Sequence, residues 1–519
     1  MAYYRGKFYP PKPGEENKKK SKWNPAWKKS KTVPGSLYRP IANPDSAQQA
    51  IFDHVCNTDR SLIVEAYAGC GKTSTCVETM YRLPIGVRKD IGYIIFAKRN
   101  QEEAVGKCPP EVSCKTAHAF GLNAISRAFG KIDVDKEKDD RIAVALVGAD
   151  DKQAELRYML VRGMSLAKDY LAENEEQVIA ACEKHGIEFC DLPEKDFASK
   201  ILEGMEVSAK QPCIVSFADM VWLPIKLNLT VPTFKYLFLD ELQDLNLARI
   251  ELAFRAVGNG KLIGVGDGQQ AIFAFSGADR FAMQKMRERA NADILPLHKT
   301  YRCGKAIVEY AKQFVPDYEA AEMNQEGLVA SVSKEKMLDR NGAGAGDFVL
   351  SRINAPLVSM AMQFLKENRK CNIQGNDLGN NLLFMIKRSK ATNVASFQAW
   401  LEDWKNAEVE RLNAKKRDYA HIIDKAACLE AFCEGESNIE FVKEKINILF
   451  DKDEDDRTKE ANRITLSTIH KAKGLERDRV WLLTDSFVVK AKTEEDKEQE
   501  NNIMYVGCTR AKNELYLVE

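Results

Sequence analysis

A strand, loop and helix pattern near the amino end of the chain constrains the fold more than any other feature. The apolar run Leu62–Val64 predicts a buried strand, the small residues from Ala66 to Gly71 predict a tight loop, and Lys72 and Thr73 open a helix. A loop of this kind directs backbone N–H groups and a helix N-terminus at one point, which suits the phosphates of a nucleotide. The lysine would reach the β- and γ-phosphates, and the threonine hydroxyl would bind Mg²⁺. We therefore predict a phosphate-binding loop, although Ala66 stands where the general pattern has glycine.

Further nucleotide contacts are expected on both sides of this lysine. The segment from Asn43 to Ile51 has the pattern of a capped helix start. Gln48 in this helix carries the paired donor and acceptor that match an adenine edge, but the same residue also suits an exposed helix position. The loop contacts would come from Ala68, Gly69, Cys70, Gly71, Lys72, Thr73 and Ser74.

Polar side chains follow two later apolar strands. Asp240 and Glu241 come directly after one strand, and Gln270 follows the next. In open α/β sheets the ligand lies outside the carboxyl ends of the strands, so we expect these side chains near the phosphate-binding loop. Asp240 would hold Mg²⁺ together with Thr73, Glu241 would activate the attacking water, and Gln270 would contact the γ-phosphate. This set predicts nucleotide hydrolysis.

Strands alternate with helices in an order typical of parallel sheets covered by helices, so we predict an α/β fold with two such units. Each unit is interrupted by a helical, charged insertion. The predicted organisation is a basic disordered arm (1–40), a first α/β domain (41–121 and 216–293) with a helical insertion (122–215), and a second α/β domain (294–374 and 462–519) with a smaller helical insertion (375–461).

Charge is balanced over the whole chain but not along it. The 77 lysines and arginines nearly cancel the 76 acids, so net charge names no partner. Residues 1–40 are rich in lysine and arginine, contain only Glu15 and Glu16 as acids, and include Trp23 and Trp27. Such an arm suits phosphate attraction and base stacking, or serves only as a solubilising tail.

The cysteines and the hydropathy predict a soluble intracellular protein. The thirteen cysteines include no C-x-x-C pair and no spacing typical of zinc ligands, which indicates reduced thiols in the cytoplasm. No apolar run approaches the length of a membrane helix, and the amino end lacks an apolar signal core. We expect a cytoplasmic protein that is associated with the nucleoid when it binds DNA.

Six segments, in this order, resemble motifs of the superfamily 1 DNA helicases of the UvrD/Rep type. They are Ala66–Thr73, Leu239–Asp244, Val265–Ala278, Thr300–Cys303, Ser467–Glu476 and Tyr505–Ala511. The last two are the most specific, because simple nucleotidases need neither. The resemblance implies two RecA-like P-loop NTPase domains and an ATP- and Mg²⁺-dependent motor that moves 3′→5′ on single-stranded DNA. It would unwind duplex at single-strand/double-strand junctions in replication, repair or recombination.

The resemblance also assigns residues. Gln48 would read adenine, Tyr301 would stack on it, Glu476 would touch the ribose, and Arg302 and Arg510 would act as arginine fingers. Read alone, each arginine suits an ordinary surface position. The residues that would contact single-stranded DNA are Phe96, Lys98, His118, Phe120, Phe275 and His470. Stacked rings suit a sequence-tolerant motor, although core packing is the alternative for each phenylalanine.

The chain departs from the family pattern at three positions. Ala97 stands where a polar residue is usual, Ser276 replaces a usual arginine, and Phe275 replaces a more common tryptophan. Two other functions stay open. One is a translocase on RNA or on an RNA–DNA hybrid, and the other is a DNA-binding scaffold that uses ATP only as a switch and does not unwind.

Overall fold

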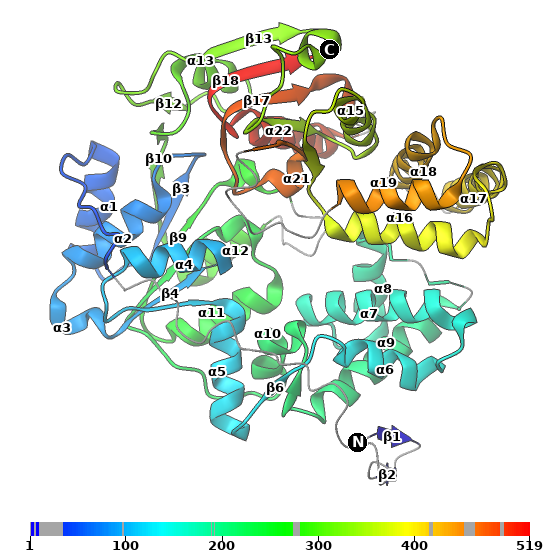
Figure 1. Ribbon diagram of the computed structural model, residues 1–519. Helices are drawn as coiled ribbons and strands as arrows, with labels where there is room; N and C mark the ends of the chain where they lie inside the picture. Colours follow the sequence, from blue (N-terminus) through cyan, green and yellow to red (C-terminus); the bar gives the residue numbers. More distant parts are fainter. Residues whose placement is uncertain are drawn as a thin grey trace. The chain divides into compact units, whose positions relative to one another are not determined.

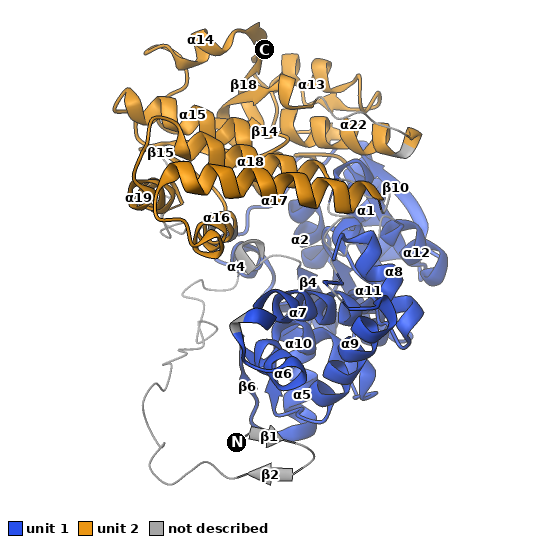
Figure 2. Cartoon of the chain, turned by 90° about the vertical axis from the view of Figure 1, so that its right-hand side faces the viewer, with its two compact units in different colours: residues 1–66, 71–297 blue, residues 67–70, 298–519 orange. Residues whose placement is uncertain are grey.

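The computed structural model describes residues 2–4, 7–9, 35–95, 98–187, 189–190, 192–272, 281–414, 419–450, 462–487 and 493–519. The chain divides into two compact units, residues 1–66 with 71–297 and residues 67–70 with 298–519 (Figure 2). Each unit contains a six-stranded sheet in which all neighbours are parallel (Figure 1). The predicted α/β class with two parallel sheets is confirmed.

The sheet of the first unit has the strand order β10-β3-β9-β8-β4-β5. Its strands are β3 (Leu62–Ala66), β4 (Ile91–Ile95), β5 (Ser113–Thr116), β8 (Tyr236–Leu239), β9 (Lys261–Gly266) and β10 (Asp293–Leu297). Strands β4 and β9 are buried along their whole length, as expected for a parallel sheet that helices cover on both faces.

Two groups of helices pack on this sheet. The first group is α1 (Ser46–Asn57), α2 (Lys72–Arg82) and α4 (Lys98–Lys107), and the second is α5 (Ala117–Phe129), α10 (Phe217–Lys226), α11 (Leu247–Val257) and α12 (Ala282–Ala290); α3 (Ile85–Arg88) is one short turn. Strand side chains alternate between the groups, as the period of two requires. Ile63 and Leu239 join the core beneath the second group, whereas Val64 and Phe238 lie beside residues of α1 and α2.

Strand β10 corrects a predicted boundary. The second domain was predicted to begin at residue 294, but Ile294 pairs with Ile63 and Leu297 with Ala66, in parallel with β3. The first unit therefore continues to Leu297. The strand directly precedes the Thr300–Cys303 motif, which made it resemble the start of the next domain.

The insertion of the first unit is helical, with α6 (Lys138–Val147), α7 (Ala154–Asp169), α8 (Glu175–Lys184) and α9 (Glu194–Ala209). The insertion at 122–215 was predicted to be helical, and the structure corrects this in one place. Strands β6 (Asp133–Val134) and β7 (Ile214–Val215) form a short parallel pair. Two residues in each strand are too few for a sequence pattern. A separate antiparallel pair, β1 (Ala2–Tyr4) and β2 (Lys7–Tyr9), lies in the predicted arm, and the arm's residues 10–34 are outside the described residues.

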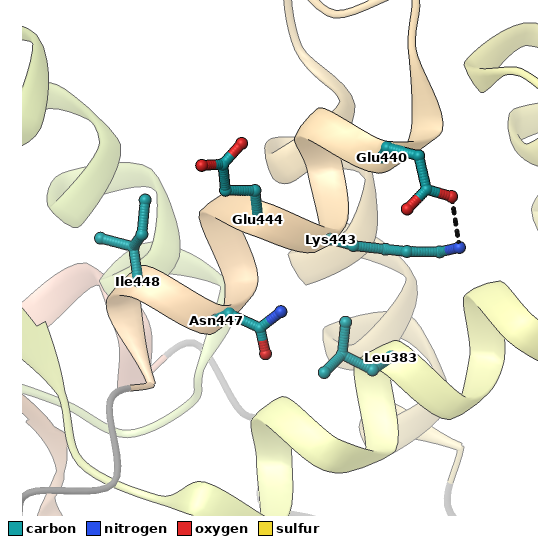
Figure 3. A pocket seen from close by; sticks show the side chains of 6 residues that line it. All are labelled: Leu383, Glu440, Lys443, Glu444, Asn447 and Ile448. Carbon is teal, nitrogen blue, oxygen red and sulfur yellow. Dashed lines mark hydrogen bonds and ion pairs between the residues drawn. The ribbon is translucent and has the colours of Figure 1, made fainter.

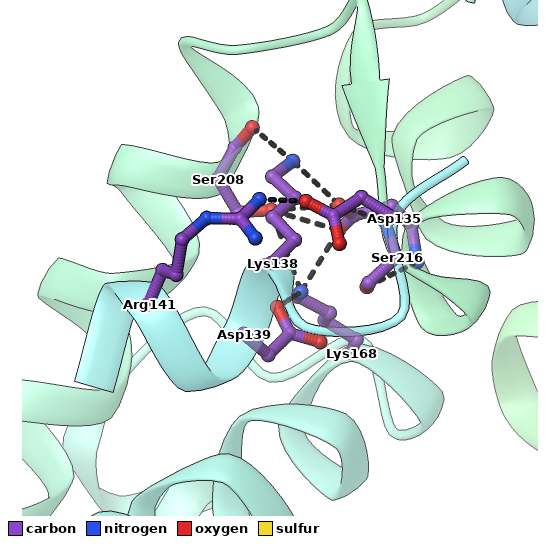
Figure 4. Close-up of polar contacts among 8 residues, drawn as sticks. Asp135, Lys138, Asp139, Arg141, Lys168, Ser208 and Ser216 are labelled. Carbon is purple, nitrogen blue, oxygen red and sulfur yellow. Dashed lines mark hydrogen bonds and ion pairs between the residues drawn. The ribbon is translucent and has the colours of Figure 1, made fainter. Parts of the chain in front are cut away.

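A buried ion network joins α6 and α7 of this insertion to α10 (Figure 4). Lys168 Nζ lies 2.8 Å from Asp139 Oδ1 and 2.8 Å from Asp219 Oδ1, and Lys138 Nζ lies 2.6 Å from Asp219 Oδ2. The Ser208 hydroxyl also donates to Asp219. Burial opposes the ionised form of Asp219, but the charges of Lys168 and Lys138 lower its pKa to about 2. Two cations thus balance two anions on α6, α7 and α10.

The sheet of the second unit has the strand order β13-β18-β17-β14-β16-β15. Its strands are β13 (Leu328–Val332), β14 (Phe348–Ser351), β15 (Cys371–Ile373), β16 (Ile464–Thr468), β17 (Arg477–Leu483) and β18 (Ala511–Val518). Helices α13 (Lys305–Ala311) and α22 (Glu494–Cys508) contact β18, whereas α15 (Ala355–Lys366) contacts β14, β15 and β16. Short elements complete the unit: β11 (Lys299–Thr300), β12 (Glu319–Ala320), α14 (Lys334–Leu338) and α21 (Ile469–Ala472).

The described part of the smaller insertion contains α16 (Asn376–Ser389), α17 (Val394–Ala414), α18 (Ala420–Cys433) and α19 (Ile439–Leu449). A shallow groove lies between α16 and α19, lined by Leu383, Glu440, Lys443, Glu444, Asn447 and Ile448 (Figure 3). Lys443 is paired with Glu440 at 2.7 Å. The groove contains none of the predicted site residues.

Candidate functional site

The phosphate-binding loop lies between β3 and α2, as the sequence predicts. Gly69 and Gly71 have φ angles of +71° and +77°, in the left-handed region that glycine adopts without strain. Gly71 is the N-cap of α2, so the helix begins at Lys72. The loop therefore turns sharply and presents a helix N-terminus that carries Lys72 and Thr73.

The structure brings Asp240 next to Thr73. The Thr73 hydroxyl lies 3.3 Å from Asp240 Oδ2, and the Tyr93 hydroxyl lies 3.2 Å from the same oxygen. The backbone N–H of Glu241 donates to Asp240 Oδ1 at 3.0 Å. Burial and the charge of Glu241 raise the pKa of Asp240 to about 6, although Lys72 and the hydrogen bonds lower it. The raised pKa means that the positive charge near Asp240 does not fully compensate for burial of its carboxylate.

These two side chains fit Mg²⁺. A carboxylate and a hydroxyl are hard oxygen ligands, and Mg²⁺ is commonly held by one or two carboxylates plus substrate phosphates. A cation at Asp240 would compensate the charge that burial makes costly. Among the described residues, no group of three or more His, Cys, Asp and Glu side chains is placed to hold a metal ion. The remaining ligands would therefore be phosphate oxygens and water.

Glu241 is held in a strained and accessible position. Its φ angle is +51°, a left-handed conformation that costs a non-glycine residue about 1–2 kcal/mol. Its Oε2 accepts a hydrogen bond of 2.7 Å from Gln243 and lies 3.7 Å from Lys72 Nζ. Its side chain is 23% exposed, so water can reach the carboxylate. Backbone strain of this kind gathers at functional sites.

A hydrogen-bond chain links Glu241 to Gln270. Gln243 donates from Nε2 to Glu241, and its Oε1 accepts the backbone N–H of Asp267 at 2.9 Å. Asp267 Oδ2 in turn accepts the amide of Gln270 at 2.6 Å. Burial raises the pKa of Asp267, and nearby Lys72 opposes this rise. The strand-end residues that the sequence singled out thus form one connected set with Lys72.

Gln48 is buried, so the alternative of an exposed helix glutamine is wrong. Its exposed fraction is 3%. With Asp45 it forms the capping box of α1, and its Nε2 donates to the Thr75 hydroxyl of α2 at 3.4 Å. Its assignment to adenine stays a prediction, and in this structure its amide ties α1 to the helix that follows the phosphate-binding loop.

Residues 67–70 of the loop belong to the second unit. The backbone N–H of Tyr301 donates to the Gly69 carbonyl at 3.0 Å. A Cβ added at Gly69 would lie 2.5 Å from Arg302 Cβ and 2.5 Å from the Thr300 hydroxyl. Only glycine therefore fits here, because Arg302 and Thr300 approach the loop so closely.

The residues predicted to stack on adenine and to contact the ribose, Tyr301 and Glu476, both lie in the second unit. Tyr301 is 41% exposed, which leaves its ring accessible for stacking. Glu476 Oε2 lies 2.5 Å from Arg302 Nε, and Glu476 Oε1 lies 3.0 Å from Lys512 Nζ. Burial favours the neutral form of Glu476, but the charges of Arg302 and Lys512 lower its pKa. The glutamate thus orients the Arg302 guanidinium.

Arg510 is buried rather than placed on the surface, which rules out the surface alternative for this residue. It is 1% exposed, and its guanidinium donates to the Val506 carbonyl at 2.9 Å and the Leu475 carbonyl at 3.3 Å. Burial, and then the charge of Arg302, lower its pKa to about 10. Two guanidinium groups are therefore brought into one neighbourhood of the second unit.

The residues predicted to contact DNA differ in whether the structure describes them and in how far they are buried. Phe96 and Phe275 are outside the described residues, as are the departures Ala97 and Ser276, and Lys98 is described only as the start of α4. Phe120 is 2% exposed and packs against Phe234, so its ring belongs to the core in this structure.

Two histidines remain candidates for DNA contact. His118 packs edge-on against Phe217, and burial with nearby Arg249 lowers its pKa to about 4. His470 lies in α21, and burial with the charges of Arg352 and Lys473 lowers its pKa to about 3. Both rings are therefore neutral at pH 7 in the chain without nucleic acid.

Sequence reasoning missed three residues of the site. Tyr93 and Gln243 hold Asp240 and Glu241, and Lys512 pairs with Glu476. Gln243 lies within the Leu239–Asp244 motif, two residues after Glu241, so the motif contained a signal for it. Tyr93 lies inside an apolar strand, and no local pattern distinguishes it from a core residue.

Two further predictions concerned the oxidation state of the cysteines and the presence of membrane helices. All thirteen cysteines are free thiols. Within the described ranges, none of the helices combines the length and the apolar character needed to cross a lipid bilayer.

Family models match most of the chain. Residues 46–291 match the UvrD/REP helicase N-terminal domain, and residues 351–519 match the UvrD-like helicase C-terminal domain. F-box DNA helicase protein 1 of Schizosaccharomyces pombe is 24% identical over 91% of this chain and 57% of that protein. F-box DNA helicase 1 of Gallus gallus is 24% identical over 90% of this chain and 48% of that protein.

A bacterial helicase and a viral one are also similar. ATP-dependent DNA helicase PcrA of Bacillus subtilis is 24% identical over 58% of this chain and 44% of that protein. The chain thus spans about half the length of these three relatives. The structure of arterivirus nonstructural protein 10 (helicase) with DNA covers 88% of this chain and 61% of that chain, at 13% identity and a TM-score of 0.31.

Proposed function

This chain belongs to the UvrD-like helicase family, and we propose that it is an ATP- and Mg²⁺-dependent motor that moves along single-stranded DNA and unwinds duplex at junctions. One observation carries the proposal. Lys72, Thr73, Asp240, Glu241 and Gln270 follow three adjacent parallel strands and are connected by ion pairs and hydrogen bonds through Gln243 and Asp267.

Each side chain of this set has a task in hydrolysis. Lys72 binds the terminal phosphates, and Thr73 with Asp240 holds Mg²⁺, which supplies charge neutralisation at the phosphates. Glu241 orients the attacking water and accepts its proton, a task suited to a carboxylate that water can reach. Gln270 contacts the γ-phosphate, and its bond to Asp267 relays the presence of that group to Gln243 and Glu241.

Arg302 and Arg510 complete the charge balance in this proposal. The departing phosphate carries negative charge that arginine fingers stabilise. The approach of Arg302 to Gly69 supports a role at the phosphates, since Gly69 belongs to the phosphate-binding loop. Glu476 keeps the Arg302 guanidinium oriented until phosphate competes for it.

Movement follows from the difference between the ATP-bound and ATP-free states. Arginines and phosphates attract each other only while the triphosphate is present, so hydrolysis shifts a two-state equilibrium. Alternating contacts to DNA by Phe96, Lys98, Phe275 and His470 would turn this cycle into steps. The family resemblance supports 3′→5′ movement, and replication, repair or recombination as the setting.

Unwinding of tailed duplexes tests the proposal. The full chain is incubated with duplexes that carry a 3′ or a 5′ single-stranded tail, with and without ATP and Mg²⁺. We expect ATP-dependent unwinding of the 3′-tailed duplex, and a Glu241→Gln variant should bind the same DNA without unwinding it. ATP hydrolysis without any strand separation would instead support the ATP-switched scaffold.

An RNA substrate is the other alternative that the experiment separates. ATPase activity is measured with DNA, RNA and hybrid oligomers of the same sequence. Stronger stimulation by RNA or by the hybrid than by single-stranded DNA would contradict the assignment of DNA as the track.

A further inference from the structure

Two tyrosine hydroxyls bind the same residue of the phosphate-binding loop. The backbone N–H of Ala68 donates to the Tyr505 hydroxyl at 2.8 Å, and the Tyr318 hydroxyl donates to the Ala68 carbonyl at 2.7 Å. Both peptide groups that flank Ala68 are therefore held by side chains of the second unit, the unit to which residues 67–70 belong. We call Tyr318 and Tyr505 the tyrosine clasp.

The members of the clasp are buried and packed on each other. Ala68, Tyr318 and Tyr505 are all 0% exposed. The two tyrosine rings pack edge-on with centroids 5.9 Å apart, and Tyr67 packs edge-on against Tyr318 at 6.0 Å. Tyr505 lies in α22, five residues before Arg510. The Tyr318 hydroxyl also lies 3.7 Å from Cys303 Sγ, a weak acceptor, so loss of the Ala68 carbonyl would leave it with a poorer partner.

Peptide planarity makes this contact relevant to phosphates. In a trans peptide the C=O and the N–H point in opposite directions. The bond from Tyr318 to the Ala68 carbonyl therefore turns the N–H of Gly69 away from Tyr318. The neighbouring donors are already paired, since the Ala68 N–H binds Tyr505 and the Cys70 N–H donates to the Tyr67 carbonyl at 3.4 Å. The N–H of Gly69 is thus the loop donor whose direction the Tyr318 contact sets.

We propose that Tyr318 and Tyr505 are positioning residues, which fix both peptide groups of Ala68 and so orient the N–H of Gly69 for the triphosphate. This inference rests on the proposed ATPase function and deepens it. Phosphate recognition by such a loop depends on donors that are already aimed at the ligand. The two tyrosines would thereby set how well residues 67–70 of the loop contact ATP.

Removal of the hydroxyls tests the clasp with little change in packing. Tyr318→Phe and Tyr505→Phe keep the rings and each lose one hydrogen bond to Ala68. A net hydrogen bond is worth a factor of about threefold to tenfold in affinity, so each variant should weaken binding of a fluorescent ATP analogue by that factor. KM for ATP should rise in proportion, while DNA affinity without nucleotide stays at the wild-type value.

A matched control separates positioning from stability. Tyr516→Phe also removes a hydroxyl in the second unit, one bonded to Glu514 at 3.0 Å, and keeps the ring stacked on Trp481. This variant should bind the analogue like the wild type. A merely structural role would lower the thermal midpoint and the active fraction of the clasp variants but leave their dissociation constant and KM unchanged.

The outcomes distinguish this inference from the function on which it rests. If the wild-type chain hydrolyses ATP but the clasp variants bind the analogue normally, or no worse than Tyr516→Phe, the clasp proposal is overturned and the motor stands. If the wild-type chain binds no ATP analogue, the proposed function fails and the clasp proposal fails with it.

Discussion

Replacement of Asp240 by asparagine should stabilise the nucleotide-free chain while it removes Mg²⁺-dependent hydrolysis. The carboxylate is buried, and its two described side-chain donors are the hydroxyls of Thr73 and Tyr93. A hydroxyl both donates and accepts, so these groups can adapt to an amide. The substitution keeps the shape of the side chain and removes a charge that burial makes costly.

The magnitude follows from the pKa. Burial, with the charge of Glu241, raises the pKa of Asp240 from 3.8 to about 6. A folded-state pKa above the unfolded value gives stability that is fully present below pH 3.8 and is lost as the pH rises through about 6. Linkage with these values puts the cost of the carboxylate at about 3 kcal/mol at pH 7.5 and at roughly half of that at pH 5.

Thermal unfolding without nucleotide or Mg²⁺ provides the assay. The Asp240→Asn variant should unfold several degrees above the wild type at pH 7.5, and this gap should shrink by about half at pH 5. Asp347→Asn is the control, because Asp347 accepts hydrogen bonds from Arg479 and Trp481 and should lose stability when its charge is removed. An Asp240→Asn variant that is no more stable than the wild type at pH 7.5 would refute the reasoning.

Four other predictions test the motor. Lys72→Ala should abolish ATP hydrolysis and leave DNA binding mostly intact, as measured by phosphate release and fluorescence anisotropy; retained turnover would contradict the phosphate-binding loop. Arg302→Ala should still bind ATP but hydrolyse it about 10³-fold more slowly in single-turnover assays, the scale of a lost arginine finger, and a near-normal rate would remove it from that role. Phe275→Ala should weaken the stimulation of ATPase by DNA, whereas unchanged stimulation would argue against stacking. Deletion of residues 1–40 should lower DNA affinity and flatten its dependence on salt, and an identical salt slope would show that the arm does not touch DNA.

The sequence predicted the parts of the fold and site that rest on local patterns. Asp240 directly follows one apolar strand, and Lys72 follows another apolar strand and a loop of small residues. Both strands lie where the sequence patterns predicted them. Parallel pairing then places their carboxyl ends at one edge, so the meeting of Thr73 with Asp240 follows from topology. The family resemblance was confirmed by the match to both helicase domain models.

Features that depend on tertiary pairing were beyond the sequence. The strand at Asp293–Leu297 is apolar in either sheet, and only its pairing with β3 assigns it to the first unit. The three-residue strand Cys371–Ile373 is too short for a periodic signal. The burial of Arg510 and Phe120 could not be predicted either, since neither composition nor spacing tells which face of a helix or turn other elements cover.

Hydroxyl contacts to the backbone were equally hidden. Tyr318 lies outside the six family motifs, and Tyr505 is the first residue of the Tyr505–Ala511 motif, with no role assigned to it. Their partner, Ala68, is more than two hundred positions away along the chain. Contacts between distant residues leave no mark in a single sequence, so the tyrosine clasp required coordinates.

The buried ion network of the helical insertion has a consequence for experiments in solution. Lys138, Lys168, Asp139 and Asp219 carry equal and opposite charges away from water, where mobile ions do not reach them. Raising the ionic strength should therefore detach the protein from nucleic acid while this bundle keeps its shape. A salt titration of DNA binding then reports dissociation of the DNA alone, with no contribution from unfolding of the helical insertion.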